Sequence, residues 1–227
     1  MGQPVMIIED ILVLLHVMFF CYWLGTDLGV FYSSKLMRRS DISPETRRYC
    51  FRIFSFLDQA PRVSMAGIVT VGATMGILRG YIKVDPIWIV PIWIIGVFWV
   101  FTVIYLYVNE HHPAKIATLR KIDFNFRLAM IAFLAGLAVL SLMGKGVIDD
   151  AWLSVKILLF ATAMTCGVII RMQMKDLPRY FVPMLKGTAT PEDIATTQKM
   201  MASVRPPVLT IWAITVVAAA LGLWKPI

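Results

Sequence analysis

The sequence predicts an all-α membrane protein, a polytopic bundle of about six transmembrane helices. Hydrophobic residues make up 59% of the chain and charged residues only 16%, and the mean hydropathy is +0.74, which is too apolar for an ordinary soluble domain. Six apolar stretches reach the length of about 20 residues that crosses the hydrocarbon core. They are approximately residues 7–32, 60–78, 86–108, 126–143, 151–170 and 208–224. Because the links between them are short, residues 1–227 are expected to form a single integral domain in a lipid bilayer.

The first apolar stretch, residues 7–32, carries a stripe of polar residues. Trp23 and Asp27 follow His16 by seven and eleven residues, and at about 100° per residue both return to within roughly 20° of His16. A polar line along a membrane helix costs free energy and usually marks function. The first ten residues are acidic and contain no basic residue. The stretch is therefore expected to be a retained span and not a cleaved signal peptide.

The second and sixth stretches are preceded by similar capping signals. Ser43-Pro44-Glu45 and Thr190-Pro191-Glu192 each combine a capping hydroxyl, a proline at the first helical position and an acid in the first turn. Each is expected to begin a short helix that leads into a span. The apolar face of the first short helix is suited to lying along the bilayer surface. The match indicates either an internal duplication that pairs the first span with the fifth, or shared capping chemistry alone.

Small residues in the second span favour close helix packing. Gly72 and Gly76 are four residues apart, the spacing that places two glycines on one helix face and lets another helix approach closely. Such a face more often serves packing than ligand binding. A close neighbour is therefore expected at this face of the second span.

The fifth stretch, residues 151–170, contains Lys156. This lysine lies about five residues inside the outer end of its helix, a depth similar to that of His16 in the first stretch. At about 1.5 Å per residue, both side chains are expected roughly 8 Å below the outer edge of the hydrocarbon, where they can share a site. The alternative is that Lys156 snorkels, its long stem carrying the ammonium to the outer headgroups.

Basic residues are distributed unevenly between the two sides of the membrane. Of the 22 Lys and Arg residues, 17 fall in segments 33–62, 109–127 and 171–205, which alternate with the segments of the other side. The positive-inside bias therefore predicts that these segments face the cytoplasm and that both termini are outside. Topology and contact with lipid headgroups account for the charge. No basic stretch is paired with a recognition fold, so nucleic acid is not an expected partner.

Asp27 lies near the cytoplasmic end of the first span. Arg62 and Arg171 lie at the same boundary, so a structural ion pair between Asp27 and one of these arginines is the favoured interpretation. The alternative is that Asp27 relays protons, a common role for an intramembrane acid.

Other metal-binding residue types are scattered along the chain. His111 and His112 are adjacent and do not share a helix face, so a solvated loop is favoured over a metal site. Cys21, Cys50 and Cys166 form no CxxC motif and are expected to be small apolar filler. The 14 methionines are diffuse, although thioethers suit Cu(I).

Three segments of the chain together match one known family. They are His16-Val-Met-Phe-Phe-Cys-Tyr-Trp23, followed by Gly25 and Tyr32; Trp152-Leu-Ser-Val-Lys156; and the ending from Arg205-Pro206-Pro207 to Trp224-Lys225-Pro226-Ile227. In this order they resemble the first helix, the Trp-Leu-His-Val-Lys segment and the last helix of the HemJ family of membrane protoporphyrinogen oxidases. Ser154 stands where that family often has histidine. The family usually has four helices, so the resemblance implies a four-helix core with residues 86–143 as an inserted hairpin.

The resemblance implies a haem-associated oxidoreductase in the bacterial cytoplasmic (inner) membrane. His16 matches the histidine thought to ligate haem b, and Lys156 matches the family's functional lysine. Trp23 would line the haem-binding site. A lysine at this position can bind a haem propionate or the carboxylate of a tetrapyrrole substrate. Quinone is the other expected partner. No second histidine lies inside a span, so haem held by two histidines is disfavoured.

A second resemblance leads to a different class of function. Six or more helices with the same histidine-bearing entry also resemble the broader CopD-like group of copper-resistance membrane proteins. This implies a permease or accessory subunit that handles copper or another small cation, with His16, Asp27 and methionine side chains along a polar path. The sequence leaves both functions open, and it leaves open whether the protein is a homo-oligomer.

Overall fold

The computed structural model describes residues 3–225, with side chains from Ile7 onward, so Met1, Gly2, Pro226 and Ile227 lie outside it. Within this range the chain forms α-helices, one short 3₁₀ helix and no named strand, which confirms the all-α prediction. The elements are α1 (Gln3–Met37), α2 (Pro44–Leu57), α3 (Gln59–Leu78), η1 (Pro86–Trp88), α4 (Ile89–Val108), α5 (Pro113–Leu142), α6 (Ala151–Gln173), α7 (Leu177–Lys186), α8 (Pro191–Ser203) and α9 (Arg205–Trp224).

Six helical segments of the described chain are long and apolar enough to cross a membrane. They are α1 from Ile7, α2 with α3, η1 with α4, α5, α6, and α8 with α9. The protein is therefore a multi-pass helical membrane protein, as predicted. The helices are longer than the apolar runs: α1 has 35 residues and so spans about 50 Å, whereas the hydrocarbon core is only about 30 Å thick.

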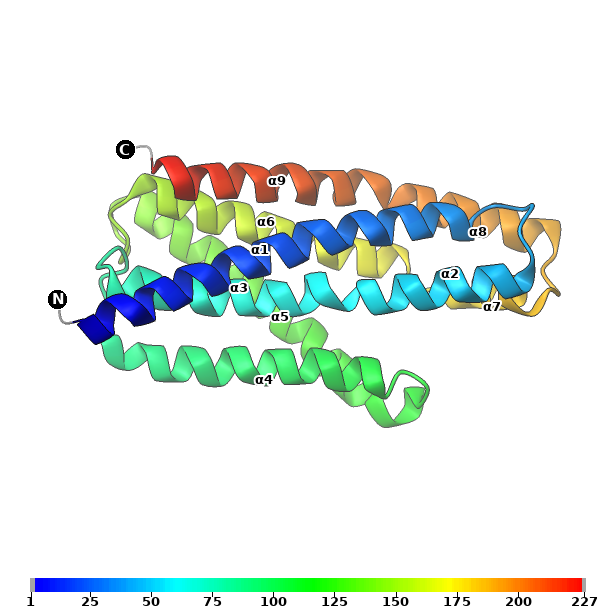
Figure 1. Cartoon of the computed structure of the whole chain (residues 1–227), viewed down its shortest axis with the longest axis horizontal. Helices are drawn as coiled ribbons and strands as arrows, with labels where there is room; N and C mark the ends of the chain where they lie inside the picture. Colours follow the sequence, from blue (N-terminus) through cyan, green and yellow to red (C-terminus); the bar gives the residue numbers. More distant parts are fainter. Residues whose placement is uncertain (1–2, 226–227) are drawn as a thin grey trace.

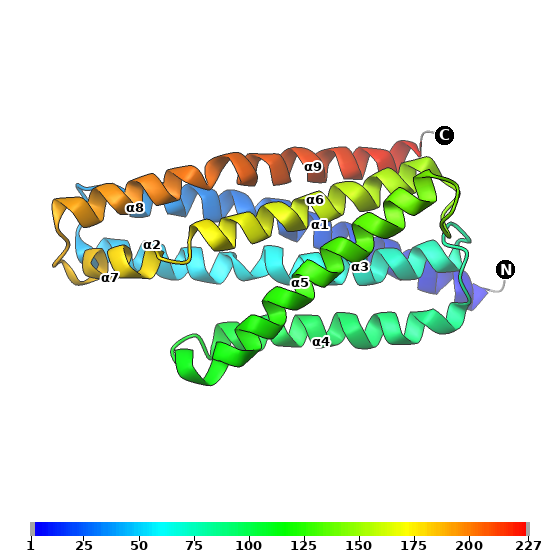
Figure 2. The ribbon, with the colours of Figure 1, turned by 180° about the vertical axis from the view of Figure 1, so that it is seen from behind.

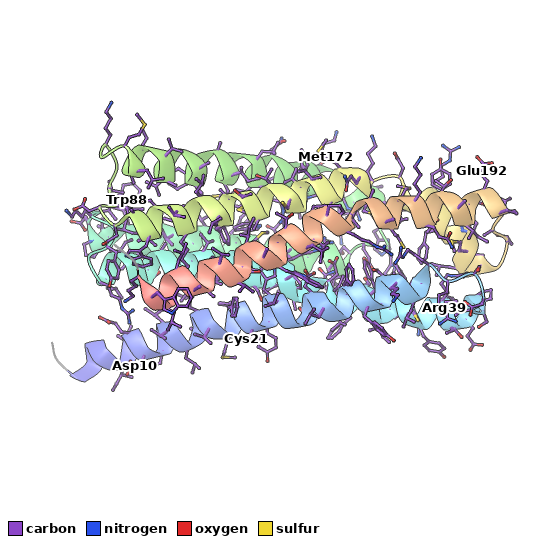
Figure 3. All side chains as sticks on the ribbon, turned by 90° about the horizontal axis from the view of Figure 1, so that it is seen from above. Asp10, Cys21, Arg39, Trp88, Met172 and Glu192 are labelled. Atoms are coloured by element: carbon purple, nitrogen blue, oxygen red, sulfur yellow. The ribbon has the colours of Figure 1, made fainter. Side chains whose placement is uncertain are left out.

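The two ends of the bundle differ in what they carry. Both ends of the described chain lie at the same end of the bundle (Figure 1), which we call the terminal end. Arg39 and Glu192 lie at the opposite end (Figure 3), which we call the basic end because the Lys- and Arg-rich segments 33–62, 109–127 and 171–205 are there. In Figure 1, α2 continues the line of α3, and α9 continues that of α8. In Figure 2, α5 crosses the bundle obliquely and diverges from α4.

One apolar core joins all six membrane segments. The helix pairs that pack most extensively are α1 with α3, α3 with α4, α5 with α6, and α6 with α9, and α1 also touches α9. Helices α1, α3, α6 and α9 share this core, but α4 packs mainly on α3 and α5 mainly on α6, so a four-helix core with residues 86–143 as an added hairpin stays a prediction. Helices α4 and α5 add to the same core through Trp99 and Leu134. Trp99 is only 2% exposed, and its ring packs edge-to-face against Phe126 at 5.1 Å.

A second apolar cluster lies at the basic end, outside the membrane core. Met37, Phe181, Met184 and Met201 form its centre, and Phe51 and Phe54 of α2 pack against it. The expectation that α2 lies along the bilayer surface is therefore wrong. Helix α2 continues the line of α3 and so does not lie across it (Figure 1), and the cluster covers Phe51 and Phe54, whereas Tyr49, Ile53 and Phe56 stay more than half exposed.

Local signals explain how this second cluster is built. The Ser43 hydroxyl accepts from the backbone N–H of Thr46 at the start of α2. Thr190 and Asp193 form a reciprocal capping box at the start of α8, so the acid used is not the neighbouring Glu192. Arg47 is 5% exposed and donates to the backbone carbonyls of Met37, Met184 and Arg39. A single guanidinium thus ties the end of α1 to α7.

Candidate functional site

His16 lies on the face of α1 that packs against α3. A Cβ atom built on Gly72 would lie 3.0 Å from Cε1 of His16 and 3.5 Å from Nδ1. Glycine at this position therefore lets the imidazole approach the α3 backbone, which agrees with the predicted close packing at Gly72 and Gly76. The Nδ1 atom is buried and has no hydrogen-bond partner. A buried ring nitrogen without a partner is rare because its desolvation is uncompensated.

Lys156 lies on α6 and approaches α9. A Cβ atom on Gly222 would lie 2.6 Å from the Lys156 Nζ atom, so glycine again makes room for the side chain. The ammonium is within electrostatic range of the His16 imidazole. His16 thus lies on α1 beside Gly72 of α3, and Lys156 lies on α6 beside Gly222 of α9; because α1 and α6 are not among the helix pairs that pack extensively, a site shared by the two side chains stays a prediction.

The electrostatic surroundings of Lys156 are basic. Within the described residues, no carboxylate forms an ion pair with Lys156, whereas six other ion pairs occur. A charged side chain in its surroundings is Lys225, at the end of α9. Lys225 in turn donates to the Tyr81 hydroxyl at 3.2 Å, and the Tyr81 ring packs edge-to-face on Trp152 at 5.4 Å. Snorkelling toward the terminal end stays the alternative for Lys156.

The predicted stripe on α1 faces the bundle along its length. Below His16, Trp23 is 5% exposed and packs edge-to-face on Phe160 of α6, with ring centroids 5.9 Å apart. Trp23 is thus a core residue about 10 Å further along the helix than His16. Ser154 is two residues from Lys156, which places it near the opposite face of α6. It does not belong to the His16–Lys156 site, although its buried hydroxyl also has no hydrogen-bond partner.

Asp27 has a different partner from the one predicted. Its Oδ2 atom accepts a hydrogen bond of 2.6 Å from the indole Nε1 of Trp212 on α9, and the Phe31 ring packs on Trp212 at 5.3 Å. The prediction of an ion pair with Arg62 or Arg171 is wrong. Arg62 pairs with Asp58, and Arg171 pairs with another aspartate.

That aspartate is Asp123, the centre of a charge cluster that the sequence analysis missed. Asp123 is 3% exposed and accepts from Nη1 of Arg171 at 2.7 Å and from Nε of Arg127 at 3.1 Å. Nη2 of Arg171 donates to the Arg120 carbonyl at 3.2 Å. The i,i+4 spacing of Asp123 and Arg127 was a visible signal, but both lie at the edge of the predicted fourth span. The cluster fastens α5 to α6 at the basic end.

Metal-binding residue types do not gather in the structure. Residues 3–225 contain no group of three or more His, Cys, Asp and Glu side chains that could hold a metal ion. His111 and His112 are exposed and line a shallow surface pocket of about 440 Å³ with their neighbours up to Lys115. Cys21 is exposed, Cys50 half-buried and Cys166 buried in the core, all as free thiols.

The fold defines a multi-pass helical membrane protein whose bundle holds a histidine on α1 and a lysine on α6 within its membrane segments. Comparison with known proteins adds no relative: no family model, no curated protein and no solved structure matches this chain.

Proposed function

We propose that this protein is a haem-associated membrane oxidoreductase resembling the HemJ family, acting on a tetrapyrrole or passing electrons to quinone. One observation carries the proposal. An imidazole with a buried, unpartnered nitrogen lies within electrostatic range of an ammonium that no described carboxylate neutralises. Both groups are expensive in a membrane interior. The alternative for His16 is a hydrogen bond to the neighbouring helix α3, where the Ile68 backbone lies close, and the alternative for Lys156 is snorkelling.

The donor set at this site fits haem b. A neutral imidazole is a normal axial ligand of haem iron, and one histidine is sufficient for such a site. His16 would hold the iron, and Lys156 would bind a propionate or a substrate carboxylate. The side of His16 that faces α3, including Nδ1, is filled at Gly72, so haem iron would be bound by the other ring nitrogen, Nε2, and not by the unpartnered Nδ1. When bound, haem supplies one-electron oxidation and reduction.

The protein residues around the site would bind and orient an anionic ligand. Lys156 and Lys225 are near each other, and two ammonium groups attract carboxylates more strongly in a low-dielectric interior than in water. The buried Trp23 ring and the half-buried Phe160 ring would line the site on the side toward the basic end. The two lysines favour a ligand that carries carboxylates.

The CopD-like alternative is less well supported by the same geometry. A path for a small cation needs acidic or soft ligands, whereas the charged groups near His16 are lysines. The Asp27 carboxylate already accepts a hydrogen bond from Trp212, and the described residues contain no cluster of three metal-ligating side chains. The charge of the site therefore favours an anionic ligand over a cation.

An absorption spectrum of the detergent-purified protein tests the proposal. Wild type expressed with ample haem should show a Soret band and a reducible b-type α band. His16→Ala should lose both bands and still insert, because an apolar residue lowers the cost of insertion. The matched control is the double variant His111→Ala, His112→Ala, which removes two exposed loop imidazoles and should keep the bands. A colourless wild type that retains copper would overturn the proposal in favour of the CopD-like function.

The role of Lys156 can be separated from that of His16. Lys156→Met keeps the length of the stem and removes the charge, so haem should be retained. Fluorescence titration should show about tenfold weaker binding of protoporphyrin IX, whereas binding of its dimethyl ester should be unchanged. Lys145→Met, in the exposed loop between α5 and α6, should affect neither titration. Equal binding of both porphyrins by wild type and Lys156→Met would remove Lys156 from the site.

The proposed location is the bacterial cytoplasmic membrane, with the terminal end outside. The basic end holds most Lys and Arg residues, which supports this orientation. In a background without native cysteines, Lys145→Cys should react with an impermeant thiol reagent on intact cells and Lys186→Cys should not. Arg47 is unsuitable as a probe position because its side chain is buried. The reverse labelling pattern would invert the orientation.

A further inference from the structure

A shallow pocket lies between α5 and α6 at the basic end. It has a volume of about 480 Å³, and its lining includes four basic residues and two apolar ones. The basic residues are Arg120, Lys121, Arg171 and Lys175, and the apolar residues are Phe124 and Met172. Met172 lies near the end of α6 (Figure 3). No acidic residue lines the pocket, so it presents a concentrated positive charge.

The position of the pocket corresponds to the lipid headgroup region. Its residues on α5 end at Asn125, and the apolar run of that helix begins one residue later. Its residues on α6 start at Arg171, directly after the apolar run that ends at Ile170. Both helices therefore bring their basic residues to the same membrane boundary, at the end of the bundle that the positive-inside bias assigns to the cytoplasm.

The basic wall of the pocket is held in place by specific contacts. Arg171 donates to the buried Asp123 and to the Arg120 carbonyl, and its guanidinium lies 5.5 Å from the centroid of the Phe124 ring. Asp123 is shared between Arg171 and Arg127, so one carboxylate faces two guanidinium groups. The cluster keeps a net positive charge, and the Arg171 side chain is still 37% exposed. This charge is available to an anion from outside.

An apolar surface continues from the pocket toward the membrane interior. Leu128 follows Phe124 by one helical turn, and Ile169 precedes Met172 by one turn, so each pair shares a helix face. Leu128 is 43% exposed and Ile169 is 40% exposed. A ligand that fits both surfaces has an anionic head and apolar tails, as a phospholipid has and a free anion has not.

We propose that this pocket binds the phosphate headgroup of an anionic phospholipid in the leaflet at the basic end, with the acyl chains along Leu128 and Ile169. Basic pockets between transmembrane helices commonly bind such headgroups. The bound lipid would neutralise the excess charge of the Asp123 cluster and bridge α5 to α6. The site is separate from His16 and Lys156, and it does not depend on the proposed redox function.

Native mass spectrometry of the full chain in neutral detergent tests this assignment. Wild type is titrated with phosphatidylglycerol, with phosphatidylcholine, and with inorganic phosphate as a competitor. The pocket variant combines Arg120→Gln, Lys121→Gln and Lys175→Gln; it leaves Arg171 intact because that residue holds the buried Asp123. Each basic residue near an anionic lipid contributes about fivefold to affinity, so the variant should bind phosphatidylglycerol about a hundredfold more weakly.

The matched control removes the same charge from the same end of the bundle. Lys35→Gln, Lys186→Gln and Lys199→Gln change three exposed lysines outside the pocket, and this variant should bind phosphatidylglycerol within about threefold of wild type. Unchanged elution on size exclusion shows that both variants fold. The proposal is overturned if the control loses as much affinity as the pocket variant, or if wild type does not prefer phosphatidylglycerol to phosphatidylcholine. Displacement of the lipid by millimolar phosphate would assign the pocket to a free anion instead.

Discussion

Charged side chains enter the bundle at two levels, the Asp123 cluster at the basic end and the His16–Lys156 pair toward the terminal end. At the first level, Asp123 is shared by Arg127 and Arg171, and Asp58 pairs with Arg62 nearby. At the second level, Lys156 forms no ion pair in the described chain, and its charged neighbour is another lysine. At the first level both carboxylates have an arginine partner, whereas at the second level the ammonium has no carboxylate partner in the described chain.

The difference separates charges that hold the fold from charges available to a ligand. Removing one member of a buried pair leaves its partner uncompensated and is strongly destabilising. A buried charge with no partner already bears that cost, so removing it should not destabilise the bundle. The same kind of substitution should therefore have opposite effects on stability at the two levels.

The largest effect is expected for Asp123→Ala. It leaves Arg127 and Arg171 without their shared carboxylate, which should lower the free energy of unfolding by about 3–5 kcal/mol. Denaturant unfolding in mixed micelles measures this loss. The control is Asp149→Ala, which breaks the exposed ion pair with Lys83 and should cost less than about 1 kcal/mol. Equal costs for the two variants would contradict a structural role of the Asp123 cluster.

A smaller loss is expected for Arg47→Met at the basic end. The substitution removes the donors to three backbone carbonyls and should cost about 2–3 kcal/mol. Since the bonds join α1 to α7, hydrogen exchange should accelerate in α2, α7 and α8 and stay slow in α6. Arg48→Met is the control, because Arg48 is exposed and makes a single bond to the Leu185 carbonyl. Acceleration throughout the chain would show that the two apolar clusters unfold together.

The sequence was enough to predict which segments of this chain form membrane helices, but not how long the helices are or which helices they contact. Apolarity and run length are local properties, so all six membrane segments were found. The extension of α1 to Met37 depends on packing against α7 and α8, which no local signal encodes. For the same reason the apolar face of α2 was recognised, whereas α7, which packs against Phe51 of that helix, was not.

The candidate site shows a similar division. The stripe of His16, Trp23 and Asp27 follows from helical periodicity, and it faces the bundle as expected. The predicted partner of Asp27 was wrong because the prediction paired the carboxylate with an arginine. In the structure the carboxylate accepts a hydrogen bond from a neutral indole N–H on α9. Asp123 was missed because α5 begins at Pro113, well before the apolar run that marked the fourth span.

Gly72→Val should produce a moderate loss at the terminal level. A side chain there meets the His16 imidazole, since even a Cβ atom would lie 3.0 Å from Cε1, and overpacking of this kind costs about 1–3 kcal/mol. Gly167→Val is the matched control, because nothing lies within 4 Å of a Cβ atom at Gly167. The control also carries the same change in helix propensity. Equal stability of the two variants would contradict the close contact between His16 and α3.

The smallest effect on stability, and the only one of opposite sign, is expected for Lys156→Met. The substitution removes an ammonium that has no carboxylate partner and keeps the apolar stem that packs beside Gly222, so the ligand-free protein should gain about 1 kcal/mol or stay unchanged. The same unfolding measurement is made in the absence of added porphyrin, with Lys145→Met as the exposed control, which should lie within about 0.5 kcal/mol of wild type. A loss comparable to that of Asp123→Ala would mean that Lys156 has a structural partner after all. A gain in stability together with weaker binding of a porphyrin diacid is the combination expected of a charge retained for a ligand at a cost to the fold.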